Sequence, residues 1–177
     1  LPEERRQLFS TGDAFQIGDL EIRTFAVSHD AADPVGYSIS CEGRSITIVT
    51  DTGAVTGPLM EEIRTADILV LESNHDESIL RMGRYPWFLE QRILGERGHL
   101  SNEAAALALA EVLQEEKNTG RKKCRRVLLA HLSRENNFPE MAMATVENIL
   151  EERGCPAGNE TQLIALSRTE ISPLFSV

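Results

Sequence analysis

The sequence has 177 residues, of which 41% are hydrophobic and 26% are charged, so it holds enough apolar material for one folded domain and disorder is excluded. Its formal net charge is −10, from 18 basic and 28 acidic residues, which argues against a protein that coats nucleic acid through bulk positive charge. No run approaches the roughly 18 consecutive apolar residues of a membrane-spanning helix, so we expect no membrane partner.

Apolar runs alternate with amphipathic stretches and predict one compact α/β unit over residues 1–177. We expect strands at residues 15–27, with a turn at Gly18-Asp19, and at 36–40 and 45–50, which form a hairpin around Glu42-Gly43. Residues 45–50 are apolar or β-branched throughout, which is typical of a strand covered on both faces. Further strands are expected at 67–72, 126–131 and 162–166, and helices at 58–65, at 86–97, after a cap at Ser101 or Asn102, and from 139 to 153.

The three cysteines, Cys41, Cys124 and Cys155, are widely spaced, odd in number and form no CxxC pair. This spacing is not a disulfide framework. We therefore expect a protein of the reducing cytoplasm.

Four predicted strands end in residues that can bind a metal or transfer a proton. These stretches are Ser28-His29-Asp30, Asp51-Thr52-Gly53, residues 72–76 with Glu72 and His75, and His131-Leu132-Ser133. Catalytic groups of layered α/β folds gather where strands end and loops begin. Taken singly, each residue has an ordinary explanation as a turn, cap or hydrogen-bond partner. Taken together with His99, which lies between two predicted helices, they form an imidazole and carboxylate set that suits Zn²⁺ or Mn²⁺.

These stretches resemble the motifs of metallo-β-lactamase-fold phosphodiesterases. Residues 27–37, where His29 follows a strand and precedes Gly36-Tyr37, resemble the third metal-binding motif of that family. Residues 50–53 resemble the fourth motif and residues 128–133 the fifth. The closer resemblance is to the YycJ/WalJ-type branch, bacterial cytoplasmic proteins related to tRNA 3′-processing ribonucleases, and it extends through residues 72–76, 84–87, 98–102 and 131–137.

The resemblance implies an α/β fold, the αββα sandwich of metallo-β-lactamases, of which this chain would form only the C-terminal half to two-thirds. The HxHxDH motif that defines the family is absent, since the histidines of the sequence are His29, His75, His99 and His131. In the family that motif lies further upstream, and the sequence opens on Leu1 rather than on Met. We therefore expect the C-terminal part of one domain, without its N-terminal part. An exposed apolar sheet face or edge is then expected to associate with the missing part or with a second copy.

For the full-length protein the resemblance implies a metal-dependent phosphodiesterase, in particular a DNA or RNA exonuclease in which two divalent ions, zinc or manganese, activate a water molecule. His29 and His131 are then metal ligands, and Asp51 bridges the two ions. Glu72 orients His99, which acts as the general acid for the leaving oxygen. Substrate contacts are assigned to Ser101, Asn102 and His75. The alternative for His75 is the start of a helix, and that for His99 is a purely structural pair with Glu72.

Two other functions stay open. One is a small-molecule phosphodiesterase acting on cyclic nucleotides, which the acidic net charge mildly favours. The other is an inactive fragment that only associates with other protein and holds no metal or an incomplete set. The basic run at residues 121–126 is interpreted as a helix end and solvated loop rather than a nucleic-acid contact. Tyr85 and Trp87 are expected to pack against the core rather than to stack on a base.

Overall fold

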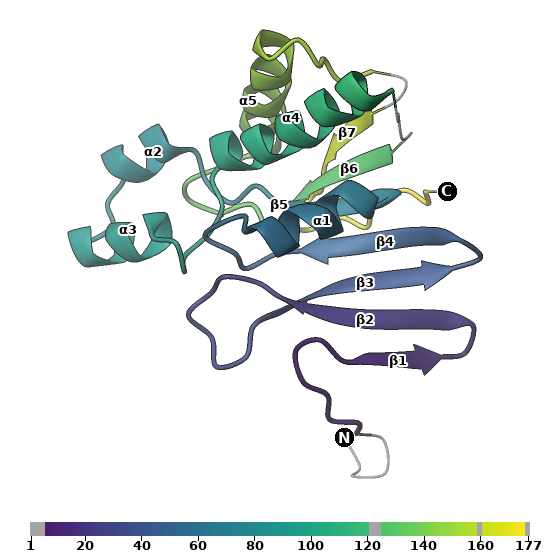
Figure 1. The fold of residues 1–177 in the computed structure, drawn as a ribbon. Helices are drawn as coiled ribbons and strands as arrows, with labels where there is room; N and C mark the ends of the chain where they lie inside the picture. The colour runs from purple at the N-terminus through teal and green to yellow at the C-terminus, as the bar shows by residue number, and fades with distance from the viewer. Residues whose placement is uncertain (1–5, 121–124, 159–160, 176–177) are drawn as a thin grey trace.

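The computed structural model describes residues 6–120, 125–158 and 161–175, which form one seven-stranded sheet and five helices (Figure 1). Strands β1 (Ala14–Ile17), β2 (Leu20–Ala26), β3 (Val35–Cys41) and β4 (Arg44–Val49) pair antiparallel. Strands β5 (Ile68–Glu72), β6 (Arg125–Ala130) and β7 (Thr161–Ala165) continue from β4 in parallel. The α/β class and the predicted strands are confirmed.

Each connection between the parallel strands places one helix on the same face of the sheet. The chain moves one strand at a time in one direction from β4 to β7, and right-handed crossovers of that kind place their helices on the same side. Figure 1 shows α1 (Gly57–Thr65), α4 (Asn102–Thr119) and α5 (Pro139–Glu152) on that side. Their apolar residues enclose the main core with Val49, Leu69, Leu71, Val127 and Leu129. The helices expected at 58–65, after Ser101 and after Pro139 are confirmed.

The opposite face of the sheet is apolar and less covered. Side chains alternate between faces along a strand, so the residues that point away from the core helices form rows across neighbouring strands. One row joins Ile39 to Ile46, and the next joins Tyr37 to Ile48 and Val70. These five side chains are only half-buried. Residues 45–50 are thus fully covered on one face alone, and the expected coverage of both faces is wrong for the described chain.

Helices α2 (Glu77–Met82) and α3 (Trp87–Leu94) extend past the end of the sheet instead of packing on its face (Figure 1). None of the α3 side chains is buried. Trp87 is 74% exposed, so the expectation that it packs against the core is wrong. The helix predicted for residues 86–97 is also shorter than expected, because Gly95 ends it.

The basic run of residues 121–126 lies partly outside the described residues, which resume at Arg125. The Arg125 side chain is buried, pairs with Glu116, and donates hydrogen bonds to the backbone carbonyls of Ile63 and Arg64. Arg126 lies over the Phe175 ring and bonds Gln162. The expectation of a solvated loop is therefore wrong for Arg125. Its buried guanidinium links β6 to α1 and α4.

Strand direction brings the predicted functional residues to one edge of the sheet. β2 and β4 both run antiparallel to β3, so β2 is parallel to β4 and to the three strands that follow. Consequently β2, β4, β5, β6 and β7 all have their carboxyl ends at the same edge.

Among the described residues no helix is both long and apolar enough to cross a bilayer.

Candidate metal centre and adjoining cavity

Four strands deliver the central side chains to this edge. His29 follows β2, Asp51 follows β4, Glu72 is the last residue of β5, and His131 follows β6. Asp51 and His131 each adopt a left-handed backbone conformation, with φ of 56° and 57°. Non-glycine residues rarely adopt this conformation, and here it turns the chain sharply where the strand ends.

Asp51 lies between two histidines. Its Oδ1 atom is 3.8 Å from Nε2 of His29 and 3.8 Å from Nε2 of His131. Zinc holds nitrogen and oxygen ligands at about 2.0–2.2 Å, so two ligands of one ion lie within about 4.3 Å of each other. The two 3.8 Å distances therefore allow Asp51 to bind a metal ion together with either histidine.

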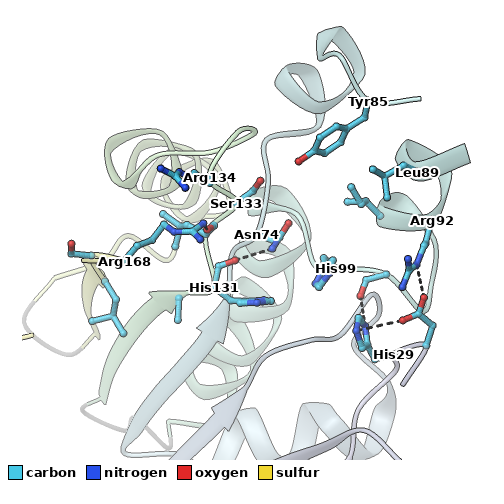
Figure 2. Close-up of a pocket in the computed structure, with 17 residues that line it drawn as sticks. His29, Asn74, Tyr85, Leu89, Arg92, His99, His131, Ser133, Arg134 and Arg168 are labelled. Carbon is cyan, nitrogen blue, oxygen red and sulfur yellow. Dashed lines mark hydrogen bonds and ion pairs between the residues drawn. The ribbon is translucent and has the colours of Figure 1, made fainter. Parts of the chain in front are cut away.

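His99 reaches the same place from the loop between α3 and α4. Its ring centroid is 5.0 Å from that of His29 and 5.3 Å from that of His131 (Figure 2). Ligand atoms of His29, Asp51 and His99 all lie within 4.8 Å of one another, so these distances also allow His99 to bind a metal ion.

Glu72 holds two of these histidines. Its side chain is fully buried, and its Oε1 atom accepts hydrogen bonds from Nδ1 of His99 at 2.8 Å and from Nδ1 of His131 at 2.7 Å. Its Oε2 atom accepts the backbone N–H of Thr52 at 2.7 Å. Burial by itself raises the pKa of Glu72, but the hydrogen bonds from His131, His99 and Thr52 outweigh it, and the pKa lies below its ordinary value. The sequence predicted the pair with His99, whereas the second bond to His131 was missed.

These hydrogen bonds fix the imidazole tautomers. A carboxylate can only accept, so His99 and His131 must donate through Nδ1. The Nδ1 atom of His29 lies 3.0 Å from the backbone carbonyl of Gly98, which also only accepts. In its neutral form each ring therefore carries its proton on Nδ1 and turns an unprotonated Nε2, the ligand form of histidine, toward the site.

Protonation of His131 competes with this ligand form. The hydrogen bond to Glu72 raises the pKa of His131 against the opposing effect of burial. A metal ion must therefore displace a proton from Nε2 of His131 as the pH falls.

The loop that carries Asp51 packs tightly on the chain that follows α3. A side chain at Gly53 would overlap the backbone of Gly95 and Gly98, so only glycine at this position allows the two segments to approach so closely. A side chain at Gly98 would overlap the carbonyl of Ile93, so glycine is also needed for the tight turn after α3. The Gly98 carbonyl of that turn contacts the His29 ring.

A cavity of about 690 Å³ opens above the histidines and lies within the usual range of about 300–1,000 Å³ for ligand sites. His29, His99 and His131 form part of its lining. Figure 2 shows Ser133, Arg134 and Arg168 on one side of it and Tyr85, Leu89 and Arg92 on the other. Sequence reasoning assigned no role to Arg134 or Arg168, which lie four and three residues beyond the ends of β6 and β7.

The three residues assigned to substrate contact lie beneath the cavity and do not line it. Ser101 is buried and caps α4 by accepting the N–H of Ala104. Asn102 is buried in an amide network, where it accepts from Ser73 and Asn137. His75 is 1% exposed, precedes the cap of α2 by one residue, and has no hydrogen-bond partner for either ring nitrogen.

Comparisons with known proteins agree on the family. The β-lactamase superfamily domain matches residues 2–119. The chain is 42% identical over 163 residues to the exodeoxyribonuclease YycJ of Bacillus anthracis, covering 92% of this chain and 59% of that protein. It is 35% identical over 177 residues to the exodeoxyribonuclease WalJ of Streptococcus pneumoniae serotype 2, covering 100% of this chain and 63% of that protein. The chain therefore spans about three-fifths of the length of these curated relatives.

The fold has solved counterparts. The metallo-β-lactamase fold protein YhfI from Bacillus subtilis superposes with a TM-score of 0.57 and 14% sequence identity, covering 88% of this chain and 51% of that chain. At this identity the likeness concerns the fold alone, and it confirms the metallo-β-lactamase fold.

Removing the charge of Glu72 tests its hold on the histidines. We expect Glu72→Gln to lower the pKa of His131 toward its ordinary value, because the amide has one acceptor oxygen where the carboxylate has two. The affinity for Zn²⁺ or Mn²⁺ should fall about 10–100-fold. Ring NMR titration of the metal-free chain and competition with a metal-binding dye measure the two effects. Glu151→Gln, on the exposed face of α5, is the control, and an unchanged pKa of His131 would refute the assignment.

His75 should make the fold sensitive to acid. Burial lowers the pKa of His75 from 6.5 to about 4, so the unfolded chain takes up this proton more readily than the folded one. Unfolding free energy should then decrease by about 3 kcal/mol on this account as the pH falls from about 6.5 to 4. His75→Leu should remove that part of the pH dependence, as measured by urea unfolding at several pH values. Parallel curves for the two proteins would contradict this origin.

Proposed function

The chain belongs to the β-lactamase superfamily, and we propose that its histidine-lined edge is part of a metal-dependent phosphodiesterase that removes nucleotides from the ends of DNA. The arrangement of His29 and His131 on either side of Asp51 carries this proposal, because both rings turn Nε2 toward one carboxylate oxygen. The names of the relatives YycJ and WalJ support DNA as the substrate.

The metal ligands of this chain are His29, Asp51 and His131 in the proposal. Imidazole nitrogen is a ligand that Zn²⁺ favours, and carboxylate oxygen is one that suits Mn²⁺. Such ions, when bound, activate water and neutralise charge on the phosphate. The Gly98 carbonyl and Glu72 keep the two imidazoles in the orientation that metal binding requires.

His99 is the general acid of the proposed reaction. Its Nδ1 is held by Glu72, so Nε2 is the atom that faces the cavity, and in the doubly protonated imidazolium form it can deliver its proton to the leaving oxygen. The side chain is 24% exposed, which leaves it accessible to a substrate. Ser101, Asn102 and His75 support this loop and the strand ends from beneath, and substrate contacts come from residues that line the cavity.

Residues 1–177 form one unit in this proposal, and further protein completes its site. Three side chains are too few for two metal ions, each of which takes at least four ligands. The relatives are longer than this chain, and the half-buried sheet face around Ile46, Ile48 and Val70 is apolar enough to pack against additional residues or a second copy. Cys41 and Cys155 are free thiols, in keeping with a cytoplasmic setting.

Metal content tests whether the site is complete. We expect the 177-residue chain to hold less than one equivalent of Zn²⁺ or Mn²⁺ after dialysis, because only three ligands converge. The complete gene product should hold two equivalents, and Asp51→Asn should reduce this number, with Asp19→Asn in the β1–β2 turn as the control. Elemental analysis gives the stoichiometry. Two tightly held ions in the 177-residue chain would overturn the incomplete site, and a complete product without metal would overturn the function.

The role of His99 can be separated from metal binding by the choice of leaving group. We expect His99→Ala in the complete gene product to slow DNA hydrolysis about 10²–10⁴-fold. Hydrolysis of bis-p-nitrophenyl phosphate should slow much less, because nitrophenolate leaves without a proton. Metal content should stay at the level of the unaltered protein. Equal losses on both substrates together with loss of metal would make His99 a metal ligand instead of the acid.

A further inference from the structure

The walls of the cavity differ in chemistry. Its lining includes three arginines and one carboxylate, Asp30, and that carboxylate is paired with Arg92 at 2.6 Å. Arg134 and Arg168 remain on the other side, toward the ends of β6 and β7 (Figure 2). In a chain with a net charge of −10, this side of the cavity is a local cluster of positive charge.

Arg168 is held in place by the backbone. One of its terminal nitrogens donates a 2.8 Å hydrogen bond to the carbonyl of Leu132, directly after His131. An arginine carries five N–H groups, and this is the one hydrogen bond of the Arg168 guanidinium to the described residues, so its other donors can face a ligand. Arg134 lies two residues further along the same loop and makes no ion pair within the described residues. Two arginine forks beside a metal centre suit the oxygens of a phosphate group.

The facing wall is apolar and aromatic. Leu89 and Ile93 lie one turn apart on α3 and both line the cavity, and Tyr85 adds an aromatic ring before the helix begins. Burial and the nearby Glu135 carboxylate raise the pKa of Tyr85, so the aromatic wall lies close to the loop that carries Arg134. An aromatic ring beside aliphatic side chains is a surface on which a nucleobase can stack.

We infer that this cavity binds the nucleotide next to the scissile phosphate, with Arg134 and Arg168 on its non-scissile phosphate and the Tyr85 wall on its base. The inference rests on the proposed function, because it takes the metal centre as the place of cleavage. The inference also favours a polynucleotide over a cyclic nucleotide as the substrate. A cyclic nucleotide carries a single phosphate and would leave the two arginines without a partner, whereas a polynucleotide occupies both positions.

Binding in the absence of metal tests the arginines independently of catalysis. We expect the 177-residue chain to bind a fluorescein-labelled single-stranded oligonucleotide in EDTA, as measured by anisotropy over a range of salt concentrations. Arg134→Ala/Arg168→Ala should weaken binding about tenfold or more, and the slope of log K against log salt should become shallower by about 1.4, since each lost phosphate contact removes about 0.7. Arg153→Ala, at the exposed end of α5, should behave like the unaltered chain. A double variant equal to this control, or an unaltered chain that does not bind, would overturn the inference.

Stacking of a base on Tyr85 can be measured separately from phosphate binding. A 2-aminopurine at the end of the oligonucleotide should lose fluorescence when it stacks on Tyr85. Tyr85→Phe should keep this quenching and Tyr85→Ala should abolish it, whereas equal quenching in both variants would contradict stacking on this ring.

Kinetics on the complete gene product separate this inference from the proposed function. Arg134→Ala/Arg168→Ala should raise KM for the oligonucleotide by a much larger factor than it slows the hydrolysis of bis-p-nitrophenyl phosphate, because that ester has no second phosphate. A product that hydrolyses neither substrate refutes the proposed function, while the binding result in EDTA still decides the nucleotide site. Hydrolysis of both substrates with no change in KM refutes the nucleotide site alone.

Discussion

The Glu72 carboxylate is the group around which this edge of the sheet is arranged. It is fully buried at the end of β5, where an unpaired charge would be very costly. Three donors offset that cost, one each from the His99 loop, from His131 after β6 and from the backbone of Thr52 after β4. Satisfying this buried carboxylate therefore favours a fold in which the three loops lie together, before any metal or substrate is bound.

The sheet topology supplies the rest of the arrangement. Five strands end at one edge because β2 and β4 flank the antiparallel β3 and the remaining strands follow β4 in parallel. The strand ends contribute imidazole and carboxylate side chains, and α1, α4 and α5 cover one face of the sheet. The rigid sheet fixes the positions, so the loops that carry the reactive groups need little regular structure of their own.

Much of this could be predicted from the sequence, for a physical reason. Buried strands read as apolar runs, and polar residues directly after such runs must emerge at a sheet edge, which located His29, Asp51, Glu72 and His131. Sequence cannot give side-chain direction within a loop, so the bond between Glu72 and His131 was missed. Position at an edge also does not reveal burial, which is why Ser101 and Asn102 were assigned to the substrate although they lie beneath the cavity.

The errors concern residues whose surroundings depend on distant segments. Trp87 was expected in the core because large aromatic residues are usually buried, yet α3 extends past the sheet and has no core to enter. Arg125 was expected in solvent, yet it opens β6 against α1 and α4 and finds its partners more than sixty residues away at Ile63 as well as nearby at Glu116. Arg168 carried no signal at all, since one arginine after the last strand resembles any surface residue.

Four hydrogen bonds join the loop that carries His29 to α3 and to the residues that follow it. Arg92 binds Asp30, the carbonyl of Glu96 accepts from Ser28, Arg97 donates to the carbonyl of His29, and Gly98 accepts from its ring. The cavity wall formed by α3 therefore cannot swing outward without dragging the His29 imidazole with it. A ligand that contacts Leu89 and Ile93 would therefore lie against the same helix whose C-terminal end holds the His29 loop, so the cavity and the position of this imidazole share one set of hydrogen bonds.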